Sequence, residues 1–265
     1  MTRDSADASV FDTHLAGWRE WQQAPWGRLR YAVVTHVLDR HLRDLGPGLR
    51  ILDVGGGDGA EAVLFAGRGH QVTLVDYSEQ MLEQARQAAD RAGVSSRLIT
   101  VHASADDLPS LGLTGFDVAL CHFVIQYVAD PAAAVQATAD CLPPGGLVSL
   151  IAPNPASDVL TKAVRDLDFD GARDLLDAET VTATTFEHEV ARIWPATAEG
   201  FLADAGCEVV GRYGARMVLD LIADNEPKYD PAVYARIERL ELALCDRVPY
   251  RDIGRLWQLV ARRRG

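Results

Sequence analysis

The sequence contains little cysteine and no long apolar run. Its 265 residues include four cysteines, Cys121, Cys141, Cys207 and Cys245, and no two of them form a CxxC pair. Neither a zinc knuckle nor a disulfide framework is therefore indicated. The seven histidines also lack the spacing of metal ligands, so we expect no metal. No apolar run reaches the ~20 residues that cross a bilayer, and we expect no membrane contact.

Positive charge is also scarce. Lysine and arginine total 26 against 38 acidic residues, which gives a net charge of −12 and a pI of about 5.0. Such an acidic chain argues against nonspecific binding of nucleic acid, and we expect no DNA partner. The N-terminal stretch MTRDSADASV has no apolar signal-peptide segment, so we expect a cytoplasmic protein. Basic residues concentrate only near the C-terminus, at Arg247, Arg251, Arg255 and Arg262–Arg264.

Strand-length apolar runs alternate with helical patterns from residue 50 onward. Such alternation is typical of βαβ units, which place parallel strands in one sheet. The strands are apolar along their length, as expected for a sheet that helices cover on both faces. The expected strands are 50–54, 71–75, 97–101, 116–120, 146–152, 207–211 and 257–262, and the expected helices lie near 60–68, 79–93, 131–142 and 197–206.

The length favours one elaborated domain over two. Apolar spacing at Phe11, Leu15 and Trp18 indicates helices before the first strand. The insert that follows the fifth strand holds nine acidic and four basic residues. We therefore divide a single domain, 1–265, into a helical cap, 1–45, a cofactor-binding core, 46–152, a substrate-side insert, 153–195, and a C-terminal part, 196–265, with a helical insert at about 221–245.

The turn after the first strand, DVGGGDG at 53–59, marks a ligand site. A strand that ends in glycines and leads into a helix brings backbone amides close to a ligand. The spacing of Gly55, Gly57 and Ala60 also satisfies the dinucleotide fingerprint, with Asp76 near the expected distance downstream. A P-loop is excluded, because no Gly-Lys-Ser/Thr follows. The glycines alone therefore leave NAD and S-adenosylmethionine open.

Two acidic residues distinguish between these cofactors. Asp53 lies just before the glycines, and Asp58 lies within the turn. Carboxylates at these positions would repel the pyrophosphate of NAD but suit the ammonium and sulfonium groups of S-adenosylmethionine. Asp76 ends the second strand, where a carboxylate accepts the ribose hydroxyls of either cofactor. An NAD-dependent oxidoreductase is therefore the less favoured alternative.

Further motifs follow in order, namely VDYSEQM (75–81), ADDLP (105–109), FDVALCHFV (116–124) and LPPGG (142–146). With these motifs the chain resembles the class I S-adenosylmethionine-dependent methyltransferases. The resemblance implies a Rossmann-like, seven-stranded, mostly parallel sheet with a helical N-terminal cap and helical inserts after strands five and six. It also implies S-adenosyl-L-methionine as cofactor and S-adenosyl-L-homocysteine as product.

A closer resemblance, to the bacterial tRNA 5-carboxymethoxyuridine methyltransferases, covers nearly the whole chain. GRLR (27–30), RGHQV (68–72), HFVIQYVADP (122–131), GARMVLDLI (214–222) and VPYRDIGR (248–255) carry it. That family esterifies the carboxylate of a modified wobble uridine. The present chain departs from it in two places: the insert is acidic where the family has a lysine run, and Leu219 replaces an expected polar residue. The phosphate-contact surface is therefore not carried over.

The resemblance implies roles for individual residues. Arg30 would meet the cofactor carboxylate, Gly55 and Gly56 would let the backbone approach it, and Asp76 would hold the ribose. Ala105 and Asp106 would contact the adenine, and His122 would line the methyl-transfer side. We therefore expect a cofactor site made of Arg30, Asp53, Gly55, Gly56, Gly57, Asp76, Tyr77, Ala105, Asp106 and His122. The plainer alternatives are a surface ion pair for Arg30 and a core histidine for His122.

The methyl acceptor is the least determined part. We expect a small-molecule carboxylate, hydroxyl or amine, because of the acidic insert, with tRNA as the alternative. A carboxylate needs no general base, whereas a hydroxyl or amine would need one, and His122 is the candidate. The candidate substrate residues are Trp26, Arg216, Tyr250 and Arg255. If tRNA is the substrate, its phosphates should meet Arg251, Arg255 and Arg262–Arg264. The sequence sets no oligomeric state.

Overall fold

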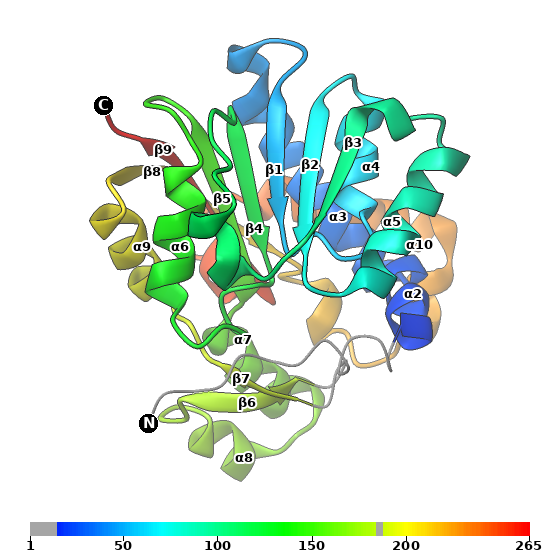
Figure 1. Ribbon diagram of the computed structural model, residues 1–265. Coiled ribbons are helices and arrows are strands. Elements are labelled where there is room, and N and C mark those ends of the chain that lie inside the picture. The colour runs from blue at the N-terminus through cyan, green and yellow to red at the C-terminus, as the bar shows by residue number, and fades with distance from the viewer. Residues whose placement is uncertain (1–14, 184–187) are drawn as a thin grey trace.

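A seven-stranded sheet lies between two layers of helices in the computed structural model, which describes residues 15–183 and 188–265 (Figure 1). The strands of this sheet are β1 Arg50–Val54, β2 Gln71–Asp76, β3 Leu98–His102, β4 Val118–His122, β5 Leu147–Pro153, β8 Cys207–Ala215 and β9 Leu256–Arg263. The longer helices are α2 Leu15–Gln23, α3 Pro25–Leu42, α4 Ala60–Gly67, α5 Glu79–Arg91, α6 Pro131–Asp140, α9 Pro195–Asp204 and α10 Pro231–Leu244.

The strand order is β3-β2-β1-β4-β5-β9-β8. The first five of these are parallel, and β9 runs antiparallel to both β5 and β8. The order reverses between β1 and β4, which is where ligands bind in open α/β sheets, beyond the carboxyl ends of the strands. The glycine-rich turn follows β1 directly. The expected Rossmann-like, mostly parallel sheet is confirmed.

The two faces of the sheet have separate cores. Successive side chains of a strand point to opposite faces, so Ile51 packs beneath α3, α4 and α5, whereas neighbouring Leu52 packs against α6 and α9. All five residues of β4 are buried, as the apolar pattern predicts for a covered sheet. Among the described residues, no helix has the length and apolar character needed to cross a membrane.

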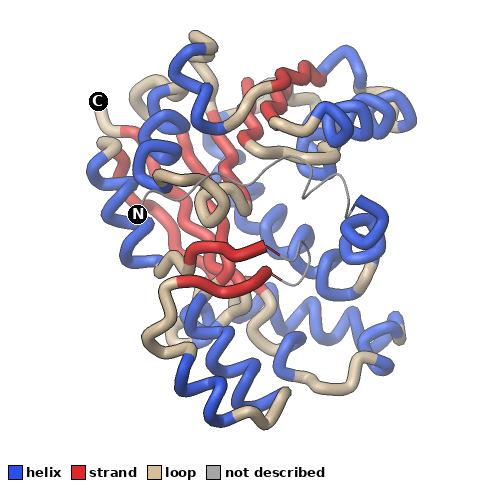
Figure 2. Tube along the Cα trace, turned by 60° about the horizontal axis from the view of Figure 1, so that its bottom comes forward, coloured by secondary structure: helices blue, strands red, loops and turns tan. Residues whose placement is uncertain are grey.

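The insert after β5 lies across the carboxyl ends of the strands (Figure 2). It consists of α7 Pro155–Leu160, the single-turn π-helix η4 Thr161–Arg165, α8 Phe169–Asp174, and a hairpin of β6 Thr180–Ala183 and β7 His188–Ala191. The sequence predicts a helical insert here, and the two-stranded hairpin is an addition. Short 3-10 turns complete the fold: η1 Arg43–Leu45, η2 Ser95–Arg97, η3 Ala105–Ser110, η5 Leu219–Leu221, η6 Glu226–Tyr229 and η7 Tyr250–Ile253.

Several element boundaries differ from expectation, among them the end of β8, which continues to Ala215 rather than stopping at 211. The fourth strand begins at Val118 rather than 116, because the Asp117 side chain accepts a hydrogen bond from the Arg50 backbone N–H before the ladder starts. The helix expected at about 221–245 begins only at Pro231. Asp230 caps it by accepting from the N–H groups of the two residues after Pro231. Phe11, which contributes to the expected N-terminal helix, lies outside the described residues.

Candidate active site

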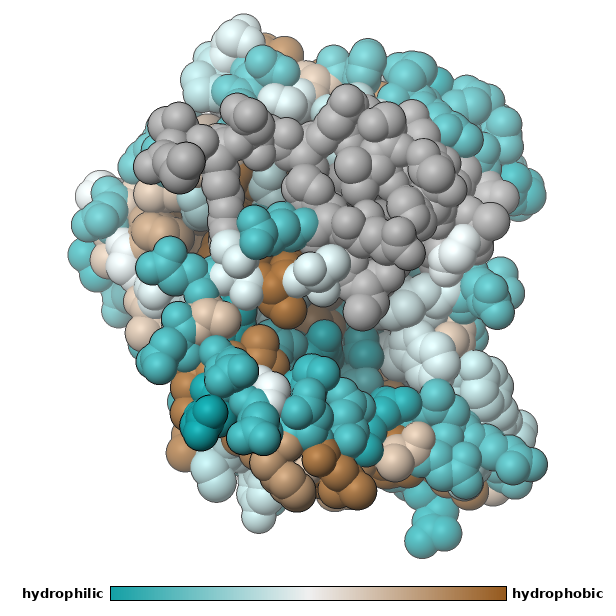
Figure 3. Space-filling model, turned by 90° about the horizontal axis from the view of Figure 1, so that it is seen from below, coloured by the Kyte–Doolittle hydropathy of each residue, from teal (hydrophilic) through white to brown (hydrophobic). Residues whose placement is uncertain are grey.

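A cavity of about 620 Å³ opens at the carboxyl ends of the parallel strands. From below, hydrophilic side chains surround a hollow between the insert and the body of the domain (Figure 3). Every residue of the expected cofactor set lines this cavity, and so do Arg216 and Arg255 from the expected acceptor set. The structure therefore brings together residues that lie more than 200 positions apart in the sequence.

The glycine-rich turn has no room for side chains. Gly55 has φ +66°, and a Cβ built there would lie 2.5 Å from a methyl of Val124. A Cβ on Gly56 would lie 2.6 Å from an Asp53 carboxylate oxygen. Since real Cβ atoms do not approach so closely, only glycine fits at both positions. The turn thus leaves its backbone open to a ligand while covering Asp53.

Asp76 holds the turn against the start of α5. One of its carboxylate oxygens accepts the backbone N–H of Gly57 at 2.9 Å, and the other accepts that of Ser78 at 2.9 Å. Ser78 in turn caps α5 by accepting from the N–H of Met81. Asp76 is buried and lines the cavity. The carboxylate therefore fixes the local backbone as well as facing the ligand space.

Asp53 lies buried beneath the turn with one oxygen, Oδ2, that has no hydrogen-bond partner among the described residues. Burial, followed by the nearby Glu61 carboxylate, raises the pKa of Asp53 well above its usual range, and Arg30 lowers it. A buried carboxylate oxygen without a partner is costly unless a ligand satisfies it. Its position in the cavity wall suits a cationic group on that ligand.

Glu61 was not predicted as a site residue, yet it lies at the centre of the polar contacts. It belongs to the first turn of α4, and its carboxylate accepts from Arg30 at 3.4 Å and from His122 Nδ1 at 2.8 Å. Burial pushes the pKa of Glu61 upward, but His122 and Arg30 outweigh it and hold that pKa at about 2. The available sequence signal is an acid in the first helical turn after the glycines.

Both ring nitrogens of His122 have partners. Nδ1 donates to Glu61, and Nε2 lies 2.9 Å from the hydroxyl of Ser149 on β5. That hydroxyl also accepts from the amide of Gln258 on β9, at 3.0 Å. In this arrangement neither nitrogen is free to take a proton from an acceptor, which disfavours the general-base interpretation.

The adenine-side residues lie on the short turn η3. Ala105 and Asp106 begin it, and Ser104 forms a capping box with Asp107 that fixes the backbone there. Ala105 and Asp106 line the cavity together with Tyr77, which follows β2. The segment thus places backbone amide and carbonyl groups beside acidic side chains in the cavity wall.

The far end of the cavity is lined by arginines. Arg255 and Arg192 both pair with Asp158 of α7, with Arg192 at 3.6 Å. Arg216 pairs with Asp220 at 2.7 Å. Arg216 and Arg255 thus both form ion pairs and line the cavity. Arg192 and Asp158 were not predicted, because the insert gives no motif that marks them.

Two expected substrate residues lie elsewhere. Trp26 packs against the core beside α10 and meets Tyr229 edge-on, with ring centroids 6.2 Å apart. Tyr250 is 47% exposed and does not line the cavity. Trp21 lines it instead. The break between α2 and α3 explains the exchange, because Pro25 starts a new helix and turns the two tryptophans in different directions.

The basic residues at the C-terminal end, Arg262–Arg264, lie away from the cavity. In the antiparallel pair, Leu256 lies opposite Pro153 at the carboxyl end of β5, whereas Arg262 lies opposite Leu147 at its amino end. Arg262 and Arg263 donate to backbone carbonyls of the α6–β5 connection. Arg262–Arg264 therefore lie at the amino ends of the parallel strands, whereas the cavity lies at their carboxyl ends. Of the expected phosphate contacts, only Arg255 lines the cavity.

Comparison with known proteins gives the family. A model described as "Methyltransferase domain" matches residues 52–150. The tRNA 5-carboxymethoxyuridine methyltransferase of Escherichia coli K12 is 34% identical over 239 residues, which are 89% of each chain. The chain belongs to the S-adenosylmethionine-dependent methyltransferases. The alternative of an NAD-dependent oxidoreductase is thereby set aside.

Two further relatives of this methyltransferase match less of it or match only its fold. A ubiquinone biosynthesis O-methyltransferase of Idiomarina loihiensis is 40% identical over 103 residues, 38% of this chain and 41% of that one. The crystal structure of magnesium protoporphyrin IX methyltransferase from Synechocystis PCC 6803 with bound SAH superposes with a TM-score of 0.63 at 17% identity, covering 97% of both chains. The latter likeness concerns the fold alone.

Proposed function

We propose that this methyltransferase transfers a methyl group to a carboxylate. The observation that carries the proposal is the arginine-lined far end of the cavity, where Arg192, Arg216 and Arg255 converge. Guanidinium groups match carboxylates in both charge and geometry. A neutral hydroxyl acceptor could take a hydrogen bond from these guanidinium groups but would not match their charge.

The cofactor end of the cavity fits S-adenosylmethionine. When bound, the cofactor supplies a methyl group attached to a sulfonium, a leaving group that is already cationic. We assign the unpartnered Asp53 oxygen to the ammonium group and the Arg30 guanidinium to the carboxylate. Asp76 and Tyr77 would hold the ribose, and Ala105 and Asp106 would contact the adenine. Gly55, Gly56 and Gly57 would supply the backbone surface.

No general base is needed for this reaction. A carboxylate acceptor is ionised at pH 7, so the protein has only to align it with the methyl carbon and exclude water. That requirement agrees with His122, whose ring nitrogens are both engaged by Glu61 and Ser149. We assign His122 a positioning role: it fixes Glu61 and thereby the Arg30 guanidinium.

A small carboxylic acid is the acceptor that we favour. The cavity wall carries Asp58, Asp106, Asp158 and Asp166 beside its cations, and the insert above it is acidic. A polyanion would have to approach this rim without the basic surface that neutralises phosphates. Arg262–Arg264, the densest basic cluster, lie at the opposite edge. A compact acid of one or two charges meets no such obstacle.

The wobble uridine of tRNA is the second candidate, and one observation favours it. The Escherichia coli relative named as a tRNA 5-carboxymethoxyuridine methyltransferase matches 89% of this chain. A match of that extent continues beyond the cofactor-binding core into the acceptor-side segments. The acceptor group named there is itself a carboxylate, so both candidates share the same chemistry at the arginine end.

The test is a label-transfer experiment with a radioactive methyl donor against total tRNA and against a small-molecule extract. Methyl esters are cleaved by mild alkali and release volatile methanol, whereas methyl ethers and methylamines are stable. We expect base-labile label in the small-molecule fraction. Base-labile label in tRNA would select the second candidate, and base-stable label in either fraction would contradict carboxylate methylation.

A further inference from the structure

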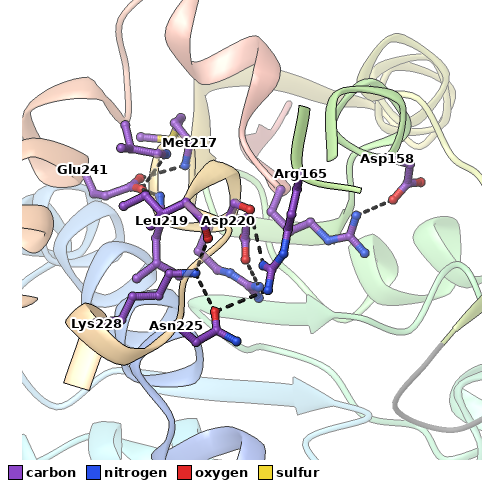
Figure 4. Close-up of polar contacts among 12 residues, drawn as sticks. Asp158, Arg165, Met217, Leu219, Asp220, Asn225, Lys228 and Glu241 are labelled. Atoms are coloured by element: carbon purple, nitrogen blue, oxygen red, sulfur yellow. Dashed lines mark hydrogen bonds and ion pairs between the residues drawn. The ribbon is translucent and has the colours of Figure 1, made fainter. Parts of the chain in front are cut away.

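The loop that follows β8 is held by a single buried carboxylate. Glu241 of α10 has no exposed surface and accepts three consecutive backbone N–H groups: Met217 at 2.9 Å, Val218 at 2.8 Å and Leu219 at 3.0 Å (Figure 4). Burial raises the pKa of Glu241, and these N–H groups oppose that rise. A carboxylate with three donors fixes the position of the backbone it binds. The loop is therefore rigid where it enters the cavity wall.

The residue just before this clamp is Arg216, and its backbone is strained. Its φ is +63°, in the left-handed region that non-glycine residues rarely adopt. Such a conformation persists only when the surroundings impose it, and it concentrates at functional sites. Here Glu241 holds the backbone on one side, and the N–H of Arg255 donates to the Arg216 carbonyl at 3.2 Å. The effect is to direct the Arg216 side chain at the cavity.

The Arg216 guanidinium is only partly satisfied. The residue is 8% exposed, and its Nη2 donates to Asp220 at 2.7 Å. Its Nε is buried and has no hydrogen-bond partner among the described residues. The guanidinium also lies 5.6 Å from the centre of the Trp21 ring, which lines the same cavity. The guanidinium lines the cavity and has a single charge partner, so it keeps N–H groups that a ligand can use.

The other two arginines share one carboxylate partner, Asp158, and the buried Nε of Arg192 likewise has no hydrogen-bond partner among the described residues. Arg192 donates to the carbonyls of Leu175, Ala178 and Pro155 and pairs with Asp158. Arg255 pairs with the same Asp158 carboxylate. These contacts join the insert to β9 and build the wall. Arg216 differs because its one charged partner, Asp220, comes from its own loop, four residues on.

We propose that Arg216 is the side chain that binds the acceptor carboxylate, and that Glu241 is the positioning residue that holds it in place. The inference rests on the proposed carboxylate acceptor. The guanidinium offers the N–H groups that Asp220 leaves unused to the acceptor carboxylate, while Asp220 keeps the side chain in its rotamer. Glu241 does not touch the substrate and acts only through the backbone of the loop.

The test uses the full chain saturated with S-adenosylhomocysteine, titrated by calorimetry with phenoxyacetate and, as the uncharged control, with phenoxyacetamide. We expect the wild type to bind the acid and not the amide. R216Q should weaken binding of the acid by about tenfold to a hundredfold, the scale of a charge-assisted hydrogen bond, and R216K should recover only part of it. E241Q should weaken acid binding while leaving the affinity for S-adenosylhomocysteine unchanged.

The matched control is R212Q, because Arg212 lies on β8, four residues before Arg216, but is exposed and pairs with Glu199. It should behave like the wild type. Retained acid binding in R216Q and R216K would overturn the role of Arg216 and leave the proposed function standing. Failure of the wild type to bind the acid would overturn both. Equal losses of acid and S-adenosylhomocysteine binding in E241Q would show that Glu241 is merely structural.

Discussion

The carboxylate of Glu61 and the imidazole of His122 form a hydrogen bond of 2.8 Å between two buried side chains, one on α4 and one at the end of β4. Arg30 joins the same carboxylate from α3. Three elements are thus connected through one buried anion beside the cofactor end of the cavity. This contact predicts how the stability of the folded protein changes as the pH falls.

We expect Glu61→Gln to destabilise the fold at pH 7 by about 3 kcal/mol, because it leaves the Arg30 guanidinium buried without its anion. The folded pKa of Glu61, about 2, lies below its ordinary value of 4.5. Its stabilising contribution is therefore complete above pH 4.5 and is lost as the pH falls toward 2. Urea unfolding of both proteins between pH 7 and pH 3 should show the difference shrinking with acid. A constant difference would contradict the ion pair.

Gly56→Ala should abolish tight cofactor binding. The new Cβ would lie 2.6 Å from an Asp53 oxygen and 2.8 Å from Leu74, so the turn must move. Gly67→Ala is the matched control, because Gly67 lies in α4 with no atom within 4 Å of its missing Cβ. That change should leave binding intact and stabilise the helix by up to about 1 kcal/mol. Calorimetry with S-adenosylhomocysteine decides, and equal affinities in the two variants would refute the close-approach argument.

Asp76→Asn should weaken S-adenosylmethionine binding by roughly 1.5–3 kcal/mol, as for hydrogen bonds to a charged group. The amide nitrogen cannot accept the second of the two N–H groups that Asp76 now holds, those of Gly57 and Ser78. Asp39→Asn, an exposed carboxylate paired with Arg68, serves as the control. The measurement is equilibrium binding with stability monitored in parallel, and an unchanged affinity would remove Asp76 from the ribose site.

His122→Gln should lower turnover by less than the ~10²–10⁴-fold expected for loss of a general base. Both nitrogens already have protein partners, so no histidine limb should disappear from the turnover-versus-pH profile of the mutant. Turnover is followed with the acceptor that the label-transfer experiment identifies. Loss of a limb near pH 6–7 together with a large fall in rate would reinstate His122 as a base.

Charge reversal at Arg262 and Arg264 should not alter any binding of tRNA, because these residues lie at the edge opposite the cavity. Reversal at Lys162, on the π-helix that lines the cavity, should weaken it and flatten its dependence on salt. Titrations at several salt concentrations would distinguish the two surfaces. A strong effect of the C-terminal pair alone would mean that RNA binds away from the methyl-transfer site.

The sequence predicts the core of this protein well because the core depends on local patterns. Strand β1, the glycine turn and Asp76 are all set by residues within about thirty positions of one another. The acceptor side depends on long-range pairing instead. Nothing near Asp158 in the sequence indicates that Arg255 and Arg192 will meet it.

Glu61 shows a different limit. Its place in the first turn of α4 suggests a solvent-exposed acid that favours the helix N-terminus. Only the approach of α3 and β4 turns it into a buried partner of Arg30 and His122. The place of Arg262–Arg264 shows a third limit, because a charge cluster predicts a surface but not which end of an antiparallel strand it will occupy.

The position of β9 between β5 and β8 has a consequence for biosynthesis. In the seven-stranded sheet β8 pairs only with β9, so it has no partner in that sheet until residues 256–263 have been translated. Gln258, which donates to the Ser149 hydroxyl beside His122, belongs to that same segment. Arg255, which pairs with Asp158 in the cavity wall, directly precedes it. The emerging chain can assemble the cofactor end first, but it cannot form a competent acceptor pocket until its last strand is made. We therefore expect a chain that ends before β9 to transfer no methyl group.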